Sequence, residues 1–308
     1  MQPLLSIVTP TLGNFSDYWL EQLLAVKGDV QFVLVYPPGV ARRAIADPRV
    51  KSLISPYKGE MMQRFLALLN ADGQYVLALD DDDYVHPDVV TPVEAYFAKF
   101  PQSLGLRLMQ ARIPVQDQEA IRQPWGTIPD IAALEVVSRR ESDRQTTLQE
   151  VPVAPLQRSF DWRYLIWPFT KRTDDHGPHI ENFNNKVWRN DKVQQVLPEL
   201  SKVTVLCGSL TWIPNWGFDR LMGLFLQAAF YQEGTVVGHW MPEPAQVRFM
   251  VGDPSQKPPR FHVVSDALLV KGFPQYGYFW NLFFNKLSYV PRIYGKMLRQ
   301  RGKKHPGA

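Results

Sequence analysis

Cysteine is almost absent from this sequence, which has a single one, Cys207, among 308 residues. One cysteine excludes an intramolecular disulfide framework and a zinc site built from several cysteines, and it favours a reducing compartment. The opening MQPLLSIVTP lacks the basic and apolar segments of an export signal, and it predicts the start of a strand. We therefore expect a cytoplasmic protein.

Long apolar runs are lacking as well. The longest candidates, residues 221–231 and 273–290, are too short or are interrupted by polar residues, whereas about 20 apolar residues are needed to span a bilayer. With 45% hydrophobic residues, the chain is still long enough to bury the core of one large domain. The sequence therefore predicts a globular protein with no membrane-spanning segment.

Acidic residues are missing from residues 267–308, which contain eight Lys or Arg and no Asp or Glu. Aromatic residues are interleaved with these basic ones in a helix-prone stretch, YGYFWNLFFNKLSYVPRIYGKMLRQRGKK. That mixture is typical of a segment lying on an anionic membrane surface, here the inner face of the cell membrane. Two alternatives stay open: the aromatic residues pack onto the domain with only the last ten residues exposed, or the tail binds nucleic acid. We expect the membrane contact and no nucleic acid.

Short β-rich runs alternate with helical segments in the first half of the chain. Strands are expected at residues 4–9, 31–36, 50–54, 74–80 and 104–113, and helices at residues 16–26, 60–71 and 87–100. Residues 114–180 contain prolines and scattered polar residues, which predicts an insertion of weak internal order. Regular structure returns with a strand at 203–207, a helix at 218–231 and a strand at 235–238. The alternation predicts an α/β fold with a mostly parallel central sheet.

Four consecutive aspartates, Asp80 to Asp83, end the buried strand in GQYVLALDDDDYVHPD. Ligands of open α/β sheets gather at the carboxyl ends of strands, and adjacent carboxylates repel one another unless a cation lies between them. A hard divalent cation such as Mg²⁺ or Mn²⁺ takes oxygen ligands and would also bridge a diphosphate. The alternative is a solvated acidic turn that caps the next helix.

This segment resembles the family-two glycosyltransferases, whose strand ends in Leu-Asp-x-Asp-Asp followed by Pro. The matching residues are Asp80, Asp82, Asp83 and Pro87, and upstream Arg64, Ala71, Gly73 and Tyr75, although the family's Asn and Gly are Phe65 and Ala67 here. LLSIVTPTLGN resembles the family's first strand and nucleotide loop, with Pro10 in place. The resemblance covers most of the first 90 residues and implies an A-type glycosyltransferase fold.

The resemblance also implies roles for individual residues on the donor side. Thr9, Pro10 and Thr11 would line the nucleotide pocket. Arg64, Asp80 and Asp81 would bind the donor, with Asp80 at its ribose, and Asp82 would bind Mn²⁺ or Mg²⁺. The family's second strand ends in Asp-Asp-Gly-Ser, where this chain has Tyr36 followed by two prolines and a glycine. Tyr36 either stacks on the base or is a packed tyrosine before a turn.

A second anchor is NWGFDRLMGLFLQAAF, which resembles the family's Gly-Glu-Asp-x-x-Leu motif, with Phe218 in place of Glu. The resemblance implies that Asp219 is the general base that deprotonates the acceptor hydroxyl, while the alternative is electrostatic support of the helix N-terminus. Upstream, ENFNNKVWRN resembles the stretch that places Lys186 and Trp188 on the acceptor side. Trp212 and Trp216 could serve there as sugar-stacking platforms, although core packing is the commoner role of tryptophan.

Two histidine-containing features are weaker candidates. The segment TDDHGPHIEN holds carboxylates and histidines that could bind a metal or acceptor hydroxyls, but its spacing fits no standard ligand pattern and also suits a polar loop. His239 is a candidate third metal ligand, and the alternative is a hydrogen-bonded histidine of the core.

Taken together, the sequence predicts a metal-dependent glycosyltransferase that moves a sugar from a nucleotide-diphosphate sugar to an acceptor hydroxyl with inversion. A saccharide or lipid-linked acceptor in bacterial polysaccharide or glycolipid assembly would suit it. We expect residues 1–113 to bind the donor, residues 114–266 (with the insertion at 114–180) to form the acceptor side, and residues 267–308 to form the tail. The alternatives are a catalytically degenerate sugar-nucleotide-binding protein at the membrane and a nucleotidyltransferase, although TPTLGNFSDY lacks the Gly-rich basic loop of the latter.

Overall fold

The computed structural model describes residues 2–138, 146–166, 179–204, 217–252, 262–287, 289–291 and 294–295. The chain forms two compact units. Unit 1 comprises residues 1–152, 183–197 and 232–252, and unit 2 comprises residues 153–182, 198–231 and 253–308. The boundary near residue 198 falls inside helix α5 (Asn190–Thr204), at its internal Pro198.

Unit 1 is built on a large mixed sheet that is mostly parallel. Among the described residues its nine strands run in the order β3 (Val50–Ile54), β2 (Val30–Tyr36), β1 (Leu5–Pro10), β4 (Tyr75–Ala78), β10 (Lys186–Arg189), β6 (Gly105–Arg107), β11 (Val236–Trp240), β9 (Thr147–Pro152) and β8 (Glu135–Val137). The first four strands are parallel, and β10 is antiparallel to both of its neighbours. The predicted α/β fold with a mostly parallel central sheet is confirmed.

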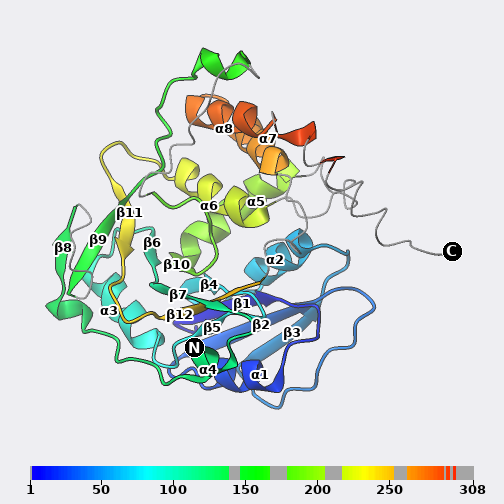
Figure 1. The fold of residues 1–308 in the computed structure, drawn as a ribbon, viewed down its shortest axis with the longest axis vertical. Helices are drawn as coiled ribbons and strands as arrows, with labels where there is room; N and C mark the ends of the chain where they lie inside the picture. Colours follow the sequence, from blue (N-terminus) through cyan, green and yellow to red (C-terminus); the bar gives the residue numbers. More distant parts are fainter. Residues whose placement is uncertain are drawn as a thin grey trace. The chain divides into compact units, whose positions relative to one another are not determined.

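Helices cover both faces of the parallel part of this sheet (Figure 1). On one face, apolar residues of α1 (Asp17–Leu24) and α3 (Val90–Lys99) join those of β1 and β2 in one core cluster, and Phe97 of α3 stacks on Tyr75 of β4. Ser16 caps α1, because its side chain accepts a hydrogen bond from the Trp19 amide. On the other face, α2 (Glu60–Leu69) packs Ala67 and Leu68 beside β1 and β2. The strands are therefore buried on both sides, which explains their nearly continuous apolar sequences.

A second, three-stranded sheet lies beside the carboxyl end of β4. It consists of β5 (Tyr84–Val85), β12 (Val247–Val251) and β7 (Gln110–Pro114). Because β5 follows the four aspartates directly, its pairing with β12 fixes the chain at the C-terminal end of the acidic run. Unit 1 also contains α4 (Gln118–Arg122) and the short helix η1 (Ile131–Ala133).

Unit 2 is helical in its described part. It contains α6 (Phe218–Ala229), α7 (His262–Gly272), α8 (Gly277–Leu287) and the short helix η2 (Trp162–Leu165), together with the end of α5. Helix α7 packs against both α6 and α8, and η2 packs against α8. In the described part of the chain, no helix is both long and apolar enough to cross a bilayer.

Three expectations need correction. The strand predicted at 203–207 is wrong where it can be seen, because Val203 lies in the last turn of α5; residues 205–207 fall outside the described residues. The strand expected at 104–113 is two strands, β6 and β7, which belong to different sheets. The described part of residues 114–180 contains more regular structure than expected, since β8 and β9 extend the main sheet beyond β11. The functional division at residues 113 and 266 stays a prediction.

Candidate functional site

A cluster of carboxylates lies where β4 ends. Ligand atoms of Asp80, Asp82 and Asp83 all lie within 4.8 Å of one another, with Asp82 exposed and Asp83 buried. Strands β1 and β2 run parallel to β4 and end at the same edge of the sheet, so the residues after β1 also reach this place. The structure thus brings together the two sequence motifs that the prediction placed at the donor site.

Asp83 is the buried member of this cluster. Its two carboxylate oxygens accept hydrogen bonds from the Met250 amide (2.8 Å) and from the Asn185 side chain (3.1 Å), and its backbone carbonyl accepts one from the Trp19 indole (2.8 Å). Burial, with the negative charges of Asp80 and Asp82 adding to it, raises the pKa of Asp83 to about 8. Burial and the neighbouring carboxylates therefore favour the protonated form of Asp83, and a cation beside it would favour the charged form.

Asp80 is held by Arg64, which projects from α2. The guanidinium donates through Nη2 to Asp80 Oδ1 (2.5 Å), through Nη1 to Asn184 (3.0 Å) and through Nε to Glu60 (2.8 Å). Asn184 donates to the same Asp80 oxygen at 3.3 Å. Because Arg64 is almost fully buried and Glu60 and Asp80 are partly exposed, the guanidinium is a fixed cation at the wall of the site.

Asp81 organises the loop after β1. Its Oδ2 accepts hydrogen bonds from the Thr11 hydroxyl (2.6 Å) and the Leu12 amide (3.3 Å), and burial raises its pKa. The Thr11 hydroxyl in turn accepts from the amide of Gly13, whose φ of +85° suits glycine. This loop is therefore tied to the acidic run, as expected if both contact one ligand.

Thr9 and Pro10, the last two residues of β1, are buried beside this loop. The Thr9 hydroxyl has no hydrogen-bond partner among the described residues. Gln63 of α2 closes the loop from the other side, because its amide donates to the carbonyls of Thr11 and Val35 at 2.8 and 2.7 Å. The contact of Thr9, Pro10 and Thr11 with a nucleotide stays a prediction.

The donor atoms of the cluster suit a hard divalent cation. Three carboxylates lie together, and the amide oxygen of Asn185 beside Asp83 is buried and has no hydrogen-bond partner in the described part of the chain. Oxygen ligands of this kind are the ones that Mg²⁺ and Mn²⁺ take. The residues present therefore fit such a cation, with Asp80, Asp82 and Asp83 as its candidate ligands.

His239 lies elsewhere in unit 1 and does not belong to the carboxylate cluster. It is buried in β11, where its Nδ1 lies 2.9 Å from the Tyr96 hydroxyl and its ring packs on Phe100. Burial, helped by the charge of Lys99, lowers its pKa to about 4. The structure thus shows the hydrogen-bonded core histidine that the sequence left open as an alternative.

Tyr36 is fully buried at the end of β2, with its ring 6.4 Å from that of Phe15. Burial raises its pKa. The ring is packed in the core, which was the alternative to base stacking in the sequence analysis. Base stacking by Tyr36 stays a prediction and would need the ring to become accessible.

The segment around Lys186 contributes more than the sequence indicated. Lys186 begins β10, is nearly buried, and donates to the Asn184 carbonyl at 2.8 Å; Trp188 is fully buried. The preceding Asn184 and Asn185 contact the acidic cluster directly and were missed as site residues. In the structure Asn185 has a φ of 58°, a conformation that asparagine adopts more readily than other non-glycine residues.

Asp219 is the second residue of α6, in unit 2, and is partly exposed. The next residue, Arg220, is buried and forms ion pairs with Glu181 (3.1 Å) and with the fully buried Asp266 (3.3 Å). Glu181 also accepts a hydrogen bond from the Tyr278 hydroxyl (2.9 Å). This buried network fixes the first turn of α6, from which Asp219 projects.

Two residues of the predicted segment TDDHGPHIEN therefore have a structural role. His179 Nε2 lies 3.1 Å from the Tyr278 hydroxyl and 3.5 Å from Glu181. Burial opposes ionisation of Glu181, but the hydrogen bond from His179 and the charge of Arg220 outweigh it and lower its pKa to about 2. The other candidates of this segment, Asp174, Asp175 and His176, and the candidate platforms Trp212 and Trp216, lie outside the described residues.

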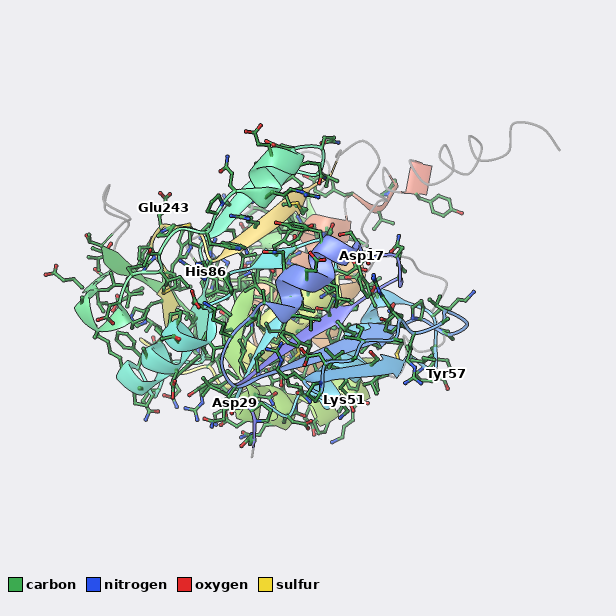
Figure 2. The ribbon with its side chains drawn as sticks, turned by 90° about the horizontal axis from the view of Figure 1, so that it is seen from below. Asp17, Asp29, Lys51, Tyr57, His86 and Glu243 are labelled. Atoms are coloured by element: carbon green, nitrogen blue, oxygen red, sulfur yellow. The ribbon has the colours of Figure 1, made fainter. Side chains whose placement is uncertain are left out.

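A cavity of about 720 Å³ opens elsewhere in unit 1, between the start of α3 and residues 125–131. His86, labelled in Figure 2, lies in its wall. None of the four aspartates lines this cavity, so it does not define the candidate site.

Comparison with known proteins supports the fold. No family model matches the chain, and no curated protein matches it in sequence. Among solved structures, residues 1–349 of S. aureus TarS in complex with UDP-GlcNAc give a TM-score of 0.51 at 12% identity, over 89% of this chain and 67% of that one. The same TarS fragment in complex with UDP gives 0.49 at 13% identity, over 89% and 66%. This chain spans about two thirds of the length of these two TarS chains, and the likeness is one of fold.

Proposed function

We propose that this protein is a metal-dependent glycosyltransferase that uses a nucleotide-diphosphate sugar. The observation that carries the proposal is the group of Asp80, Asp82 and Asp83 within 4.8 Å at the carboxyl edge of the parallel strands. A solved structure that shares the fold, that of S. aureus TarS residues 1–349, is a complex with UDP-GlcNAc, a sugar nucleotide of this class. The proposal unites the acidic cluster, the fixed Arg64 and the loop after β1 in one donor site.

In this proposal each side chain has a definite task. Asp82, with Asp80 and Asp83, would hold Mg²⁺ or Mn²⁺, which when bound offsets the charge of the diphosphate leaving group. Thr9, Pro10 and Thr11 line the nucleotide pocket, and Asp80, oriented by Arg64, contacts the ribose. Asp81 keeps the loop in place through Thr11. Lys186 is assigned to the acceptor side on the sequence resemblance, Trp216 on its place beside Asp219 in the sequence, and Tyr36 to base stacking where this chain lacks the family's acidic residue.

Asp219 is proposed as the general base. It takes the proton of an acceptor hydroxyl while that oxygen forms a bond to the anomeric carbon and the bond from this carbon to the diphosphate breaks. A single displacement of this kind inverts the anomeric configuration. The acceptor is a saccharide or a lipid-linked saccharide of bacterial polysaccharide or glycolipid assembly, presented at the membrane surface.

The first test is calorimetric titration of UDP, GDP and dTDP into the full chain, with Mn²⁺ or with a chelator. We expect one nucleotide to bind in a metal-dependent way, and Asp82→Ala to abolish that binding. Asp29→Ala is the matched control, because Asp29 is an exposed aspartate of unit 1 outside the cluster (Figure 2). Binding that does not respond to the chelator or to Asp82→Ala would refute the donor site.

The sugar nucleotide of the nucleotide that binds then serves for turnover with candidate acceptors. Release of the nucleoside diphosphate with an inverted product supports the proposal. Release of pyrophosphate would indicate a nucleotidyltransferase instead. Binding without turnover by every sugar nucleotide would indicate the degenerate binding protein.

A further inference from the structure

Helix α8 is apolar on two sides. Its inner residues Tyr278, Phe279 and Leu282 are buried within unit 2. Trp280, Phe283, Phe284 and Leu287 repeat at helical spacing on the other side, where the first three are half-buried and Leu287 is 44% exposed. An amphipathic helix of a globular protein has a polar outer side, so this outer apolar stripe requires another explanation.

Residues 158–166 are built onto this helix. The Asn281 side chain accepts from the Asp161 amide (2.8 Å) and donates to the Ser159 carbonyl (3.1 Å). Gly277 permits the close approach, because a Cβ there would lie 2.4 Å from the Phe160 amide nitrogen and 2.5 Å from the Arg158 carbonyl oxygen. In Figure 1 this green segment, which includes η2, lies beside α8.

The attached segment enlarges the apolar stripe. Phe160 packs against Phe284 with ring centroids 5.5 Å apart. Trp162, Leu165 and Ile166 follow it and are exposed by 63%, 57% and 42%. We call the outer stripe of α8 together with residues 160–166 the aromatic face. Exposed apolar residues concentrated in this way mark an interaction surface.

The charged residues on the elements of the aromatic face leave a net positive charge. Asp161 is neutralised by a two-pronged ion pair with Arg163, and Lys286 and Arg158 lie at the same elements. The buried Asp266 and the partly exposed Glu181 are paired with Arg220. In the sequence, residues 267–308 include eight basic residues and no acidic one, and six of the eight lie outside the described residues. An apolar face bordered by basic residues fits a lipid surface, which has an apolar interior beneath negatively charged headgroups.

We propose that the aromatic face docks on the headgroup region of an anionic lipid bilayer. Helix α8 has 11 residues and is therefore about 16 Å long, which suits a position in the plane of the interface. Trp162 has the apolar body and polar N–H that favour this depth, whereas the N–H of Trp280 donates to the Pro274 carbonyl and only its ring faces outward with the stripe. The proposal does not depend on the donor site, because lipid binding requires neither nucleotide nor metal.

The test is flotation of the full chain with unilamellar vesicles of phosphatidylcholine alone or with 30% phosphatidylglycerol. We expect binding to the anionic vesicles that weakens with salt, and little binding to phosphatidylcholine. Trp162→Ser/Leu165→Ser should weaken binding by about tenfold, whereas the control Tyr57→Ser/Leu69→Ser, which changes exposed residues of unit 1, should leave it unchanged. Lys286→Gln should weaken binding more than Lys51→Gln, which is its control in unit 1. Lys51 and Tyr57 are labelled in Figure 2.

A second measurement locates the contact. Brominated lipid in the vesicles should quench tryptophan fluorescence of the wild type, and Trp162→Phe should lose part of that quenching while retaining binding. Absence of binding to anionic vesicles, or an equal effect of the face and control variants, would overturn the proposal. So would sedimentation showing that the aromatic face instead joins two copies of the chain, or retention on single-stranded nucleic acid in place of vesicles.

Discussion

The side chain of Asn185 donates a hydrogen bond to Asp83 at 3.1 Å while its backbone occupies the left-handed region at φ 58°. Its backbone amide also donates at 2.9 Å to the carbonyl of Ala78, two residues before the acidic run begins at Asp80. One asparagine therefore fixes both the start of β10 and the buried carboxylate of the cluster. These two tasks can be separated by substitution.

Asn185→Gly should keep the backbone conformation and lose the side-chain hydrogen bond. We expect it to lower the free energy of unfolding by about 1–2 kcal/mol, since a buried carboxylate loses a donor. Asn185→Ala should cost about 1 kcal/mol more, because alanine is strained at this φ. Urea denaturation of both variants is the measurement, and an alanine variant as stable as the glycine variant would contradict the backbone argument.

Arg64→Lys tests the wall of the donor site. Lysine keeps the charge but cannot hold Asp80, Asn184 and Glu60 together with one planar group. We expect metal-dependent nucleotide binding, measured by calorimetry, to weaken about tenfold through misplacement of Asp80. Arg42→Lys is the control, because Arg42 makes only one described side-chain hydrogen bond, to the Ser52 carbonyl. Equal affinities of the two variants would remove Arg64 from the donor site.

Much of this donor site was predictable because its residues follow strands in sequence. The alternation of apolar runs predicts β1, β2, β3 and β4 to within a few residues, and the carboxyl ends of parallel strands meet at one edge. Thr11 and Asp81, 70 residues apart, could thus be expected near each other, as their 2.6 Å hydrogen bond shows. The sequence pattern alone carries this part of the architecture.

The rest depends on pairings that a local pattern does not encode. Strand β10 enters the sheet antiparallel between β4 and β6, and so brings Asn184 and Asn185 to the aspartates from more than 100 positions away. Val203 was expected in a strand because β-branched residues favour strands, but the helix that begins at Asn190 continues through Pro198 and includes it. Glu181 and His179 had no recognisable spacing, since their partners come from α6 and α8.

Asp219→Asn should separate chemistry from donor binding. The amide is nearly the same size as the carboxylate but cannot accept the proton of the acceptor hydroxyl. We expect turnover to fall by about 10²–10⁴-fold with the affinity for the nucleotide unchanged. Initial rates with the sugar nucleotide identified by calorimetry provide the measurement. Turnover at the wild-type rate would show that Asp219 only supports the N-terminus of α6.

Glu181→Gln should weaken the support of that helix. Arg220 would keep Asp266 as its partner but would lose the charge of Glu181, whose pKa of about 2 reflects the pairing. Removing one carboxylate from a buried ion pair should lower the free energy of unfolding by about 3 kcal/mol. Thermal unfolding followed by circular dichroism tests this, with Glu199→Gln as an exposed control that pairs only with Lys202 in the described part of the chain. Equal melting temperatures for the two variants would contradict the support role.

His239 should make the stability of unit 1 depend on pH. Its pKa is about 4 in the folded chain and 6.5 ordinarily, because burial disfavours the charged form. Between these values His239 binds a proton in the unfolded chain but not in the folded chain, so its contribution to the free energy of unfolding decreases as the pH falls from 6.5 to 4. The loss attributable to this group is at most about 3 kcal/mol. Above pH 6.5 His239 causes no loss of stability, because it is neutral in both states.

Urea denaturation at half-unit steps between pH 4 and pH 7 measures this dependence. His239→Gln should remove this contribution, since glutamine can still hydrogen-bond to the Tyr96 hydroxyl but does not titrate. The contribution is read as the difference between the wild-type and His239→Gln curves, because other groups of the unit also titrate: burial lowers the pKa of His86, which adds a slope of the same sign, and raises the pKa of Asp81 and Asp83, which adds a slope of the opposite sign. An unchanged slope in His239→Gln would mean that His239 is hydrated or binds its proton in the folded chain. The hydrogen bond to Tyr96 would then not describe its state in solution.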